Sequence, residues 1–403
     1  MTSDTTRLAE PRVRSAPDRL PISALLALAT AVFITSLTET LPAGVLPAMS
    51  ADLGVSESAA GQTVTVYALG TALTAIPLTA ATAAWRRKQL LLTSMATFAV
   101  ANTVTAVSAS YPLTMAARFL AGVAAGVAWA LLAGYARRMA PPHLQGKAIA
   151  IAMAGIPVAL SLGVPAGTFI GKAFSWQIAF WTMTVLTVLL LGWILAVVPD
   201  YPGRREAGKA RMLSALSVPG VLPVLVVTLV FVLAHTILYT YVATFLDHIG
   251  MGRSTDLVLL VFGGASLLSI WIVGALINRR LRTLTVVSTL LVGAAGALLA
   301  VWADSPPLVY AAVTLWGLGW GGVPTLLQTA AGDAGGESAA DAAQAMLVTL
   351  WNLAMAGGGV VGGVLLGALG TASFPWSVLL LMVPVLLVVL AARVHGFPAK
   401  RTT

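Results

Sequence analysis

Twelve apolar stretches, each long enough to cross a bilayer as a helix, follow one another along this chain of 403 residues. One helical crossing of the hydrocarbon core requires about 20 apolar residues. Hydrophobic residues make up 58% and charged residues 9% of the chain, whereas soluble domains carry about 25% charged residues. Lipid must therefore surround most of the chain, and we predict an all-α integral membrane protein. The expected crossings are 21–48, 58–81, 89–108, 112–139, 147–171, 177–198, 217–247, 254–276, 283–302, 306–331, 339–369 and 373–393.

The positive charges predict the orientation. All but three of the 23 Lys and Arg residues lie before the first crossing, in or beside every second gap, or after the last crossing; the exceptions are Arg118, Lys172 and Arg253. Lys and Arg are retained on the cytoplasmic side of a membrane, whereas acidic residues contribute little. The gap at 332–338, which holds only Asp333 and Glu337, does not change this reading. Both termini are thus predicted to be cytoplasmic, and the net charge of +9 does not indicate nucleic acid.

The chain divides into two halves at its longest internal polar interruption. We expect a disordered cytoplasmic N-terminus (1–20), one six-helix bundle (21–198), a cytoplasmic linker (199–216), a second six-helix bundle (217–394) and a cytoplasmic tail (395–403). The first crossing is too long for a cleaved signal peptide. With no cysteine in the chain, disulfides and thiol chemistry are excluded.

Weak internal repetition relates the halves. Leu53-Gly54 aligns with Ile249-Gly250, and Gly122 and Gly126 align with Gly317 and Gly321, at offsets of 196 and 195 residues in the sequence. A parallel duplication of six helices places a substrate site near the middle of the membrane, between two pseudo-symmetric bundles.

Three ionisable residues inside the crossings are candidates for proton coupling. Ionisable groups are costly in a membrane and usually functional. Glu39 lies well inside the first crossing, His235 occupies the corresponding position 196 residues later, and Arg118 lies near the outer end of the fourth crossing. Glu39 could instead be a structural carboxyl, and His235 could relay protons, contact Glu39, bind substrate or only pack. Arg118 could form a bidentate pair with Glu39 or extend to the outer interface.

Aromatic and amide side chains in mid-crossing positions are candidates for the substrate cavity. They are Tyr67, Asn102, Trp129, Tyr239, Trp320, Gln328 and Asn352. Tyr and Trp also form belts at membrane interfaces, which is the simpler explanation for Trp193, Trp302 and Trp376.

Several motifs resemble the twelve-helix drug:proton antiporter branch of the major facilitator superfamily, which includes bacterial sugar, nucleoside and drug exporters. The run Glu39–Pro47 resembles the signature of the first crossing, and Arg118–Gly126 resembles the motif whose Arg is linked to proton transfer. The fifth crossing resembles the antiporter motif of exporters through Gly155, Pro157, Gly163, Pro165, Gly167 and Gly171. The resemblance implies the major facilitator fold and a monomer.

The loop that joins crossings two and three departs from this family pattern. Arg86, Arg87 and Lys88 keep its basic end, but Thr82 stands where the family has Asp and Trp85 where it has Gly. The usual charge lock of the cytoplasmic gate is therefore in doubt, and packing or the basic cluster alone would have to replace it.

The sequence predicts a transporter and no enzyme. It lacks a Gly-Lys-Ser/Thr phosphate loop, and its four histidines show no metal-ligand spacing. We expect proton-coupled efflux of a small organic molecule such as a drug, sugar or nucleoside across the inner membrane. The coupling ion is the proton, with no cofactor and no metal, and the partners are the substrate and the lipid bilayer. The alternatives are an uncoupled facilitator, a proton-symport importer or a non-transporting sensor or scaffold, the last of which the short loops do not favour.

Overall fold

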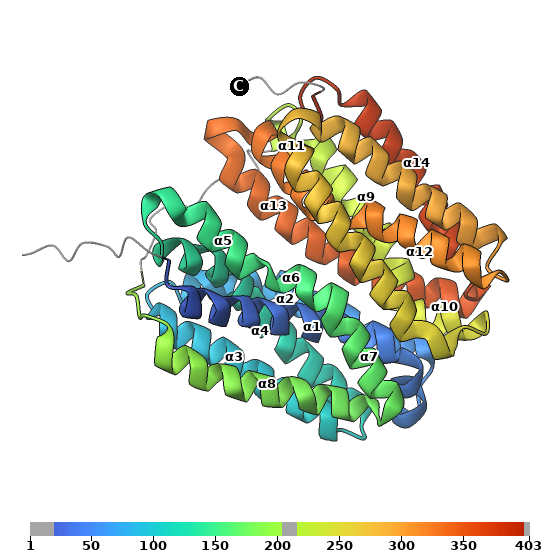
Figure 1. Cartoon of the computed structure of the whole chain (residues 1–403), viewed down its shortest axis with the longest axis horizontal. Coiled ribbons are helices and arrows are strands. Elements are labelled where there is room, and N and C mark those ends of the chain that lie inside the picture. The colour runs from blue at the N-terminus through green and yellow to red at the C-terminus, as the bar shows by residue number, and fades with distance from the viewer. Residues whose placement is uncertain (1–19, 204–215, 399–403) are drawn as a thin grey trace, which may run out of the picture.

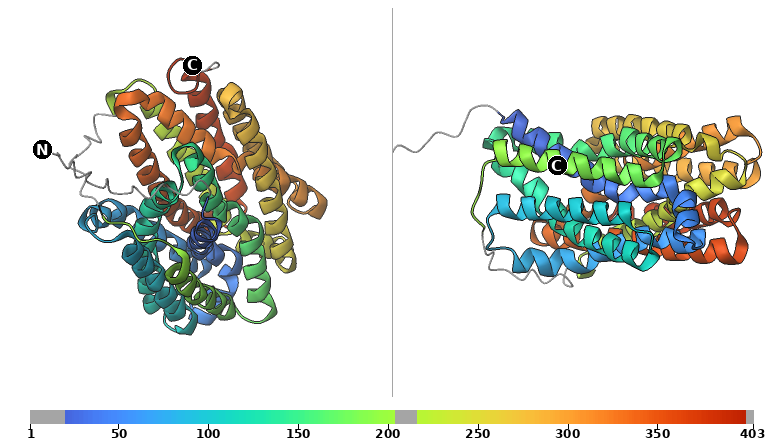
Figure 2. Two further views of the ribbon diagram at one scale, coloured as in Figure 1. Left: turned by 60° about the vertical axis from the view of Figure 1, so that its left-hand side comes forward. Right: turned by 90° about the horizontal axis from the view of Figure 1, so that it is seen from below.

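The computed structural model describes residues 20–203 and 216–398, which are almost entirely helical. The predicted disordered N-terminus and most of the predicted linker and tail lie outside the described residues. Figure 1 shows the two groups of helices beside each other, one from blue to green and one from yellow to red. The side view in Figure 2 shows that the helices of both groups run roughly along one direction.

The N-terminal bundle contains six helical segments, of which the fifth is composite. The single helices are α1 (Ile22–Leu53), α2 (Glu57–Ala81), α3 (Arg87–Val107), α4 (Tyr111–Arg138) and α8 (Trp176–Val197). The fifth crossing, between α4 and α8, consists of η1 (Pro142–Leu144), α5 (Gln145–Met153), α6 (Gly155–Val158), η2 (Ala159–Gly163) and α7 (Val164–Ala173). The element η2 is a turn of π-helix. Pro157 and Pro165 lie on either side of it, and each removes a backbone donor from the ladder.

The C-terminal bundle departs from the predicted boundaries in four places. Its elements are α9 (Val221–Thr240), α10 (Val242–His248), η4 (Gly252–Ser254), α11 (Thr255–Val301), α12 (Pro306–Trp320), α13 (Val323–Leu369) and α14 (Ser373–Ala391). The crossing predicted as 217–247 is broken at Tyr241, and that predicted as 306–331 is interrupted after Trp320 at a Gly-Gly pair. The gaps predicted at 277–282 and 332–338 shrink to single non-helical residues, Arg280 and Gly336, and Gly336 adopts φ 56°.

Ten helices of the described residues are long and apolar enough to span a membrane. The predicted crossings 58–81 and 306–331 are helical but are not among these ten. The element α2 carries polar residues on the face that meets the other bundle, and α12 contains only 15 residues before its interruption. The all-α membrane fold is therefore confirmed.

The hydrophobic core shows where the bundles join. One cluster of buried residues contains the N-terminal parts of α1 and α3 and the C-terminal parts of α4 and α8, all within the N-terminal bundle. A second cluster contains the C-terminal bundle and also Leu41, Leu46 and Trp176 from the opposite end of the N-terminal bundle. The core is therefore continuous between the bundles at the end distant from the termini, which is the predicted outer end.

Candidate functional site

Glu39 lies in α1 at the seam between the bundles and is only partly exposed. The hydroxyls on either side of Glu39 have other partners: that of Thr40 donates to the Ser36 carbonyl at 2.8 Å and that of Thr38 to the Met183 sulfur at 3.8 Å. Pro42 has no N–H with which to bond the carbonyl of Thr38, so α1 is locally weakened beside Glu39. The carboxyl interacts electrostatically with Arg118 and Tyr67 of its own bundle and with Tyr239 of the other. Glu39 is therefore an acid that interacts with residues of both bundles.

Arg118 is completely buried in α4, with 0% of its surface exposed. Its guanidinium lies over the ring of Tyr67 at 4.9 Å, and its Nε–H donates to the carbonyl of Thr63 at 3.4 Å. Neither Nη1 nor Nη2 has a hydrogen-bond partner among the described residues. The predicted bidentate pair with Glu39 is therefore absent from this conformation, and so is the alternative of an Arg that extends to the interface. The attraction between the two groups acts over a longer distance, because the low-dielectric interior screens it weakly.

Tyr67 of α2 contacts both α1 and α4. Its hydroxyl donates to the carbonyl of Thr35 in α1 at 3.1 Å. Its backbone lies so close to Gly122 of α4 that a Cβ at Gly122 would collide with the Tyr67 carbonyl. Gly122 thus allows α2 and α4 to approach closely, which sets Arg118 beside the Tyr67 ring.

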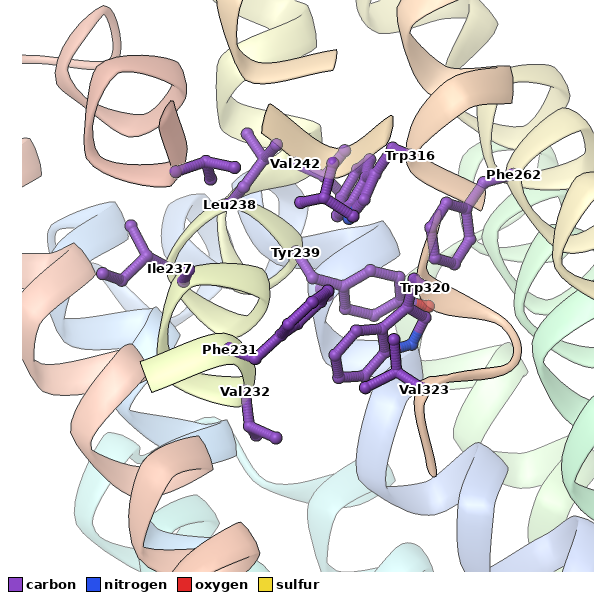
Figure 3. Packing of buried hydrophobic residues seen from close by; sticks show 14 of the residues in the cluster. Phe231, Val232, Ile237, Leu238, Tyr239, Val242, Phe262, Trp316, Trp320 and Val323 are labelled. Carbon is purple, nitrogen blue, oxygen red and sulfur yellow. The ribbon is translucent and has the colours of Figure 1, made fainter. Parts of the chain in front are cut away.

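His235 lies in an aromatic cluster of the C-terminal bundle, which we call the aromatic box: Phe231, His235, Tyr239, Phe262, Trp316, Trp320 and Trp351. The imidazole stacks on Trp320 with ring centroids 3.5 Å apart and planes 6° apart. It also stacks on Tyr239 at 5.1 Å, and the Trp316 indole N–H donates to its Nδ1 at 3.1 Å. Figure 3 shows the surrounding rings from α9, α11 and α12 converging on one region.

Tyr239 joins the box to Glu39. Its hydroxyl is buried without a hydrogen-bond partner among the described residues, and its ring contacts His235, Phe262 and Trp316. Because it also interacts electrostatically with Glu39, it lies between the acid of one bundle and the imidazole of the other. The sequence places Glu39 and His235 at equivalent positions, and the structure brings them to a common region through Tyr239.

The other predicted cavity residues are dispersed. Asn102 is buried inside the N-terminal bundle, where its Nδ2 donates to the Thr38 hydroxyl at 3.1 Å and its Oδ1 has no partner among the described residues. Asn352 donates to the carbonyl of Val348 in its own helix at 2.9 Å. Trp129 is half-buried and Gln328 is exposed. Contact of these four side chains with substrate stays a prediction.

Sequence reasoning missed four of the seven residues of the aromatic box: Phe231, Phe262, Trp316 and Trp351. Trp316 precedes Trp320 by four residues in α12, just as His235 precedes Tyr239 by four in α9. Residues four apart lie on the same face of a helix. This shared spacing is the signal that could have identified Trp316. Phe262 comes from α11 and carries no comparable local signal.

The glycines of the antiporter motif face α1. A Cβ at Gly155 would collide with the backbone of α1 at Ala29 and Phe33, one at Gly163 would meet the Phe33 ring at 2.9 Å, and Gly167 and Gly171 lie against the side chains of Leu41 and Val45. The motif therefore forms a smooth surface along the helix that carries Glu39. The conformational role that the resemblance implies for these glycines stays a prediction.

The basic loop is fixed by an acid from within its own bundle. Arg86 forms an ion pair with Asp200, whose carboxylate also accepts the backbone N–H of Lys88 at 3.2 Å. The backbone N–H of Arg87 donates to the Tyr201 carbonyl at 2.8 Å. The Arg86 guanidinium holds the pKa of Asp200 below its ordinary value. Asp200, just after α8, thus provides a carboxylate to this loop, in which Thr82 only bonds its own helix at the Leu78 carbonyl.

A set of contacts that we call the outer latch joins the bundles at the predicted outer end. Lys172 of α7 forms an ion pair with Asp256 of α11 at 2.6 Å. The Ser58 hydroxyl donates to the Gly363 carbonyl at 2.9 Å, and the Gln62 amide donates to the Gly359 carbonyl at 3.1 Å and to the Tyr241 hydroxyl at 3.3 Å. Further hydrogen bonds between the bundles join the Thr65 hydroxyl to the Ala356 carbonyl at 3.4 Å and the Tyr241 hydroxyl to the Ser58 carbonyl at 3.3 Å.

Comparison with known proteins decides the family. The sequence model of the Major Facilitator Superfamily matches residues 28–359. The chain belongs to this superfamily. This transporter is similar to the human organic anion transporter MFSD10 (TETRAN), with a TM-score of 0.64 and 19% identity over 93% of this chain and 99% of the other. That likeness confirms the fold.

Two bacterial relatives cover nearly the whole transporter. It is 26% identical to the purine ribonucleoside efflux pump NepI of Escherichia coli K12, over 91% of this chain and 93% of that protein. It is 28% identical to the transcription regulatory protein OpdE of Pseudomonas aeruginosa, over 92% of this chain and 94% of that protein. Relatives in this family thus include efflux pumps.

Proposed function

We propose that this transporter exports a small organic molecule from the cytoplasm in exchange for protons, with Glu39 as the proton carrier. The observation that carries the proposal is the position of Glu39, between Tyr67 and Arg118 of one bundle and Tyr239 of the other. A carboxyl at such a seam changes its charge and its partners when the bundles move. The efflux function of NepI supports the direction of transport.

We propose a planar, hydrogen-bonding molecule as the substrate, with a purine ribonucleoside as the first candidate. Aromatic rings of the box supply stacking surfaces. Unpartnered polar groups lie on both sides of the seam, at the Arg118 guanidinium and the Tyr239 hydroxyl. Buried polar groups of this kind are normally hydrogen-bonded, so they are suited to a ligand that carries hydroxyls. The substrate of NepI supports the same class.

The driving force is sufficient for concentrative export. One charge that crosses the membrane gains about 2.3 kcal/mol per 100 mV, and one pH unit contributes about 1.4 kcal/mol. A hundredfold gradient of a neutral substrate requires about 2.7 kcal/mol. One or two protons per substrate would therefore suffice.

Transport into proteoliposomes tests the coupling. We expect an imposed pH gradient to drive radiolabelled inosine above its equilibrium concentration in vesicles with the native protein. Glu39→Gln should lose this gradient dependence, because an amide cannot take up a proton. Glu57→Gln, at the start of α2, is the matched control and should transport normally. Gradient-driven accumulation by the Glu39→Gln variant would remove Glu39 from the coupling role.

The same assay separates the alternatives. An uncoupled facilitator would only equilibrate inosine, and a proton symporter would accumulate it in the direction of proton flow. If inosine does not move at all, a thermal-shift screen of nucleosides, sugars and antibiotics at two pH values identifies the substrate. We further propose a monomer in the inner membrane with both termini in the cytoplasm, which the alternate placement of Lys and Arg supports.

A further inference from the structure

The hydrogen bond between Trp316 and His235 determines the protonation of the imidazole. An indole nitrogen is a donor only, so the Nδ1 that it contacts must offer a lone pair. That bond, 3.1 Å long and buried, is incompatible with an imidazolium ion, in which both nitrogens carry protons. The ring is therefore neutral with its proton on Nε2.

The surroundings of His235 reinforce this state. Only 7% of the residue is exposed, and rings from α9, α11 and α12 pack against it. Among these neighbours Tyr239 alone is titratable, and Glu39 of α1 interacts electrostatically with that tyrosine. Burial without a hydrogen-bonded carboxylate disfavours the charged form of an imidazole. Nothing in the box offers a counter-ion at hydrogen-bond distance to an added proton.

We infer that His235 does not carry the coupling proton but serves as a fixed hydrogen-bond donor to the substrate through Nε2–H, and that Trp316 is the positioning residue that sets this tautomer. The substrate group that meets it must be an acceptor, such as a ring nitrogen or a carbonyl oxygen of a planar ring. The stacked Trp320, 3.5 Å away, prevents the imidazole from rotating to offer its other nitrogen. The inference deepens the proposed function and rests on it for its substrate class, but the tautomer can be tested without any substrate.

The test is nitrogen NMR of protein labelled with ¹⁵N-histidine in lipid nanodiscs, titrated from about pH 5 to 8, the range in which an unperturbed imidazole changes charge. The chain has four histidines, and His235→Gln assigns the signal. We expect His235 to remain neutral with Nε2–H throughout. In Trp316→Phe, which keeps an aromatic ring but has no N–H, we expect mixed tautomers or titration within this range. Trp302→Phe removes an exposed indole and should leave the signal unchanged.

Each result bears on one claim. A native His235 that becomes an imidazolium in this range would overturn the inference, and so would a Trp316→Phe variant whose tautomer is unchanged. Neither outcome affects the coupling role proposed for Glu39. If inosine transport is established, Trp316→Phe should raise its KM on the order of three- to tenfold, the value of one hydrogen bond, with proton coupling intact. A loss of coupling at unchanged KM would contradict the division of roles.

Discussion

Arg118 is a buried cation whose Nη1 and Nη2 have no hydrogen-bond partner among the described residues. A buried charge without a hydrogen-bonded counter-ion is destabilising, and its replacement by an apolar residue is often neutral or stabilising. A protein keeps such a residue when another conformation or a ligand pairs with it. Here the candidates are the deprotonated Glu39 after a movement of α1 and the polar groups of a bound substrate.

Replacement of Arg118 should therefore separate stability from function. We expect Arg118→Met to leave the melting temperature unchanged or raised while gradient-driven transport falls by at least about tenfold, which corresponds to a lost coupling of about 1.4 kcal/mol. The measurements are thermal unfolding in detergent and vesicle transport. A strong decrease in melting temperature would show that the cation supports the fold in this conformation.

Single residues also show how far sequence reasoning extends. Charge in an apolar context identified Glu39, Arg118 and His235, because ionisable groups in a membrane are rare. The absence of the Glu39–Arg118 pair could not be foreseen, since it depends on how α1, α2 and α4 pack and on the Tyr67 side chain, which contacts both α1 and Arg118. Trp316 was missed because an indole inside an apolar helix resembles ordinary core packing.

At the scale of elements, the composite fifth crossing presents a surface of small residues against which α1 packs. Its glycines remove the side chains that would otherwise interlock the two helices. Gly155 makes the least adaptable contact, since its Cβ would meet backbone atoms of Ala29 and Phe33, the latter at 2.7 Å. The flexible Leu41 side chain faces Gly167 instead.

Substitution of Gly155 tests this contact. Gly155→Val should lower stability by about 1–3 kcal/mol, the usual cost of overpacking, and should slow transport because α1 can no longer approach. Gly192→Ala in α8, where a Cβ meets nothing within 4 Å, is the control and should be neutral or stabilising by up to about 1 kcal/mol. Equal effects of the two substitutions would contradict a specific role for Gly155 in the packing of α1.

The segment Pro199–Gly203 contains Asp200, whose ion pair with Arg86 leads to a pH-dependent prediction. Because Arg86 lowers the pKa of Asp200, the ion pair stabilises the folded state above the ordinary Asp pKa and loses this effect as the pH falls through the lowered value. We expect Asp200→Asn to lower the melting temperature slightly at neutral pH, by at most about 2 °C for an exposed pair. The difference from native protein should shrink as the pH falls below the ordinary Asp pKa, because Asp200 then takes up a proton and the ion pair is lost. A difference that persists in acid would point to packing rather than charge.

For the whole molecule, the sequence predicted the helical membrane fold because bilayer thickness dictates the length of apolar stretches. It did not predict the break at Tyr241 or the single-residue joins at Arg280 and Gly336. These features depend on contacts between distant segments, such as the Tyr241 hydroxyl with the Gly359 carbonyl at 2.9 Å. Hydropathy averaged over a crossing does not contain that information.

The outer latch should open once in each transport cycle, and the lack of native cysteines makes this directly testable. We expect a short bis-maleimide to cross-link Lys172→Cys to Asp256→Cys and to abolish transport. The control pair, Asp52→Cys with Gln177→Cys, lies within the N-terminal bundle, where the native side chains are hydrogen-bonded at 2.9 Å. Its cross-link should leave transport largely intact. Full activity with the outer latch cross-linked would exclude rocking of the bundles at this end.

The outer latch holds the bundles together at the predicted outer end through the Lys172–Asp256 ion pair and the hydrogen bonds of Ser58 and Gln62. We expect an unloaded carrier to rest with its entrance toward the cytosol, where an exporter collects its cargo. An idle protein in this posture keeps Glu39 out of reach of external protons. Under the proposed coupling, the membrane potential then drives only those turnovers that export a substrate.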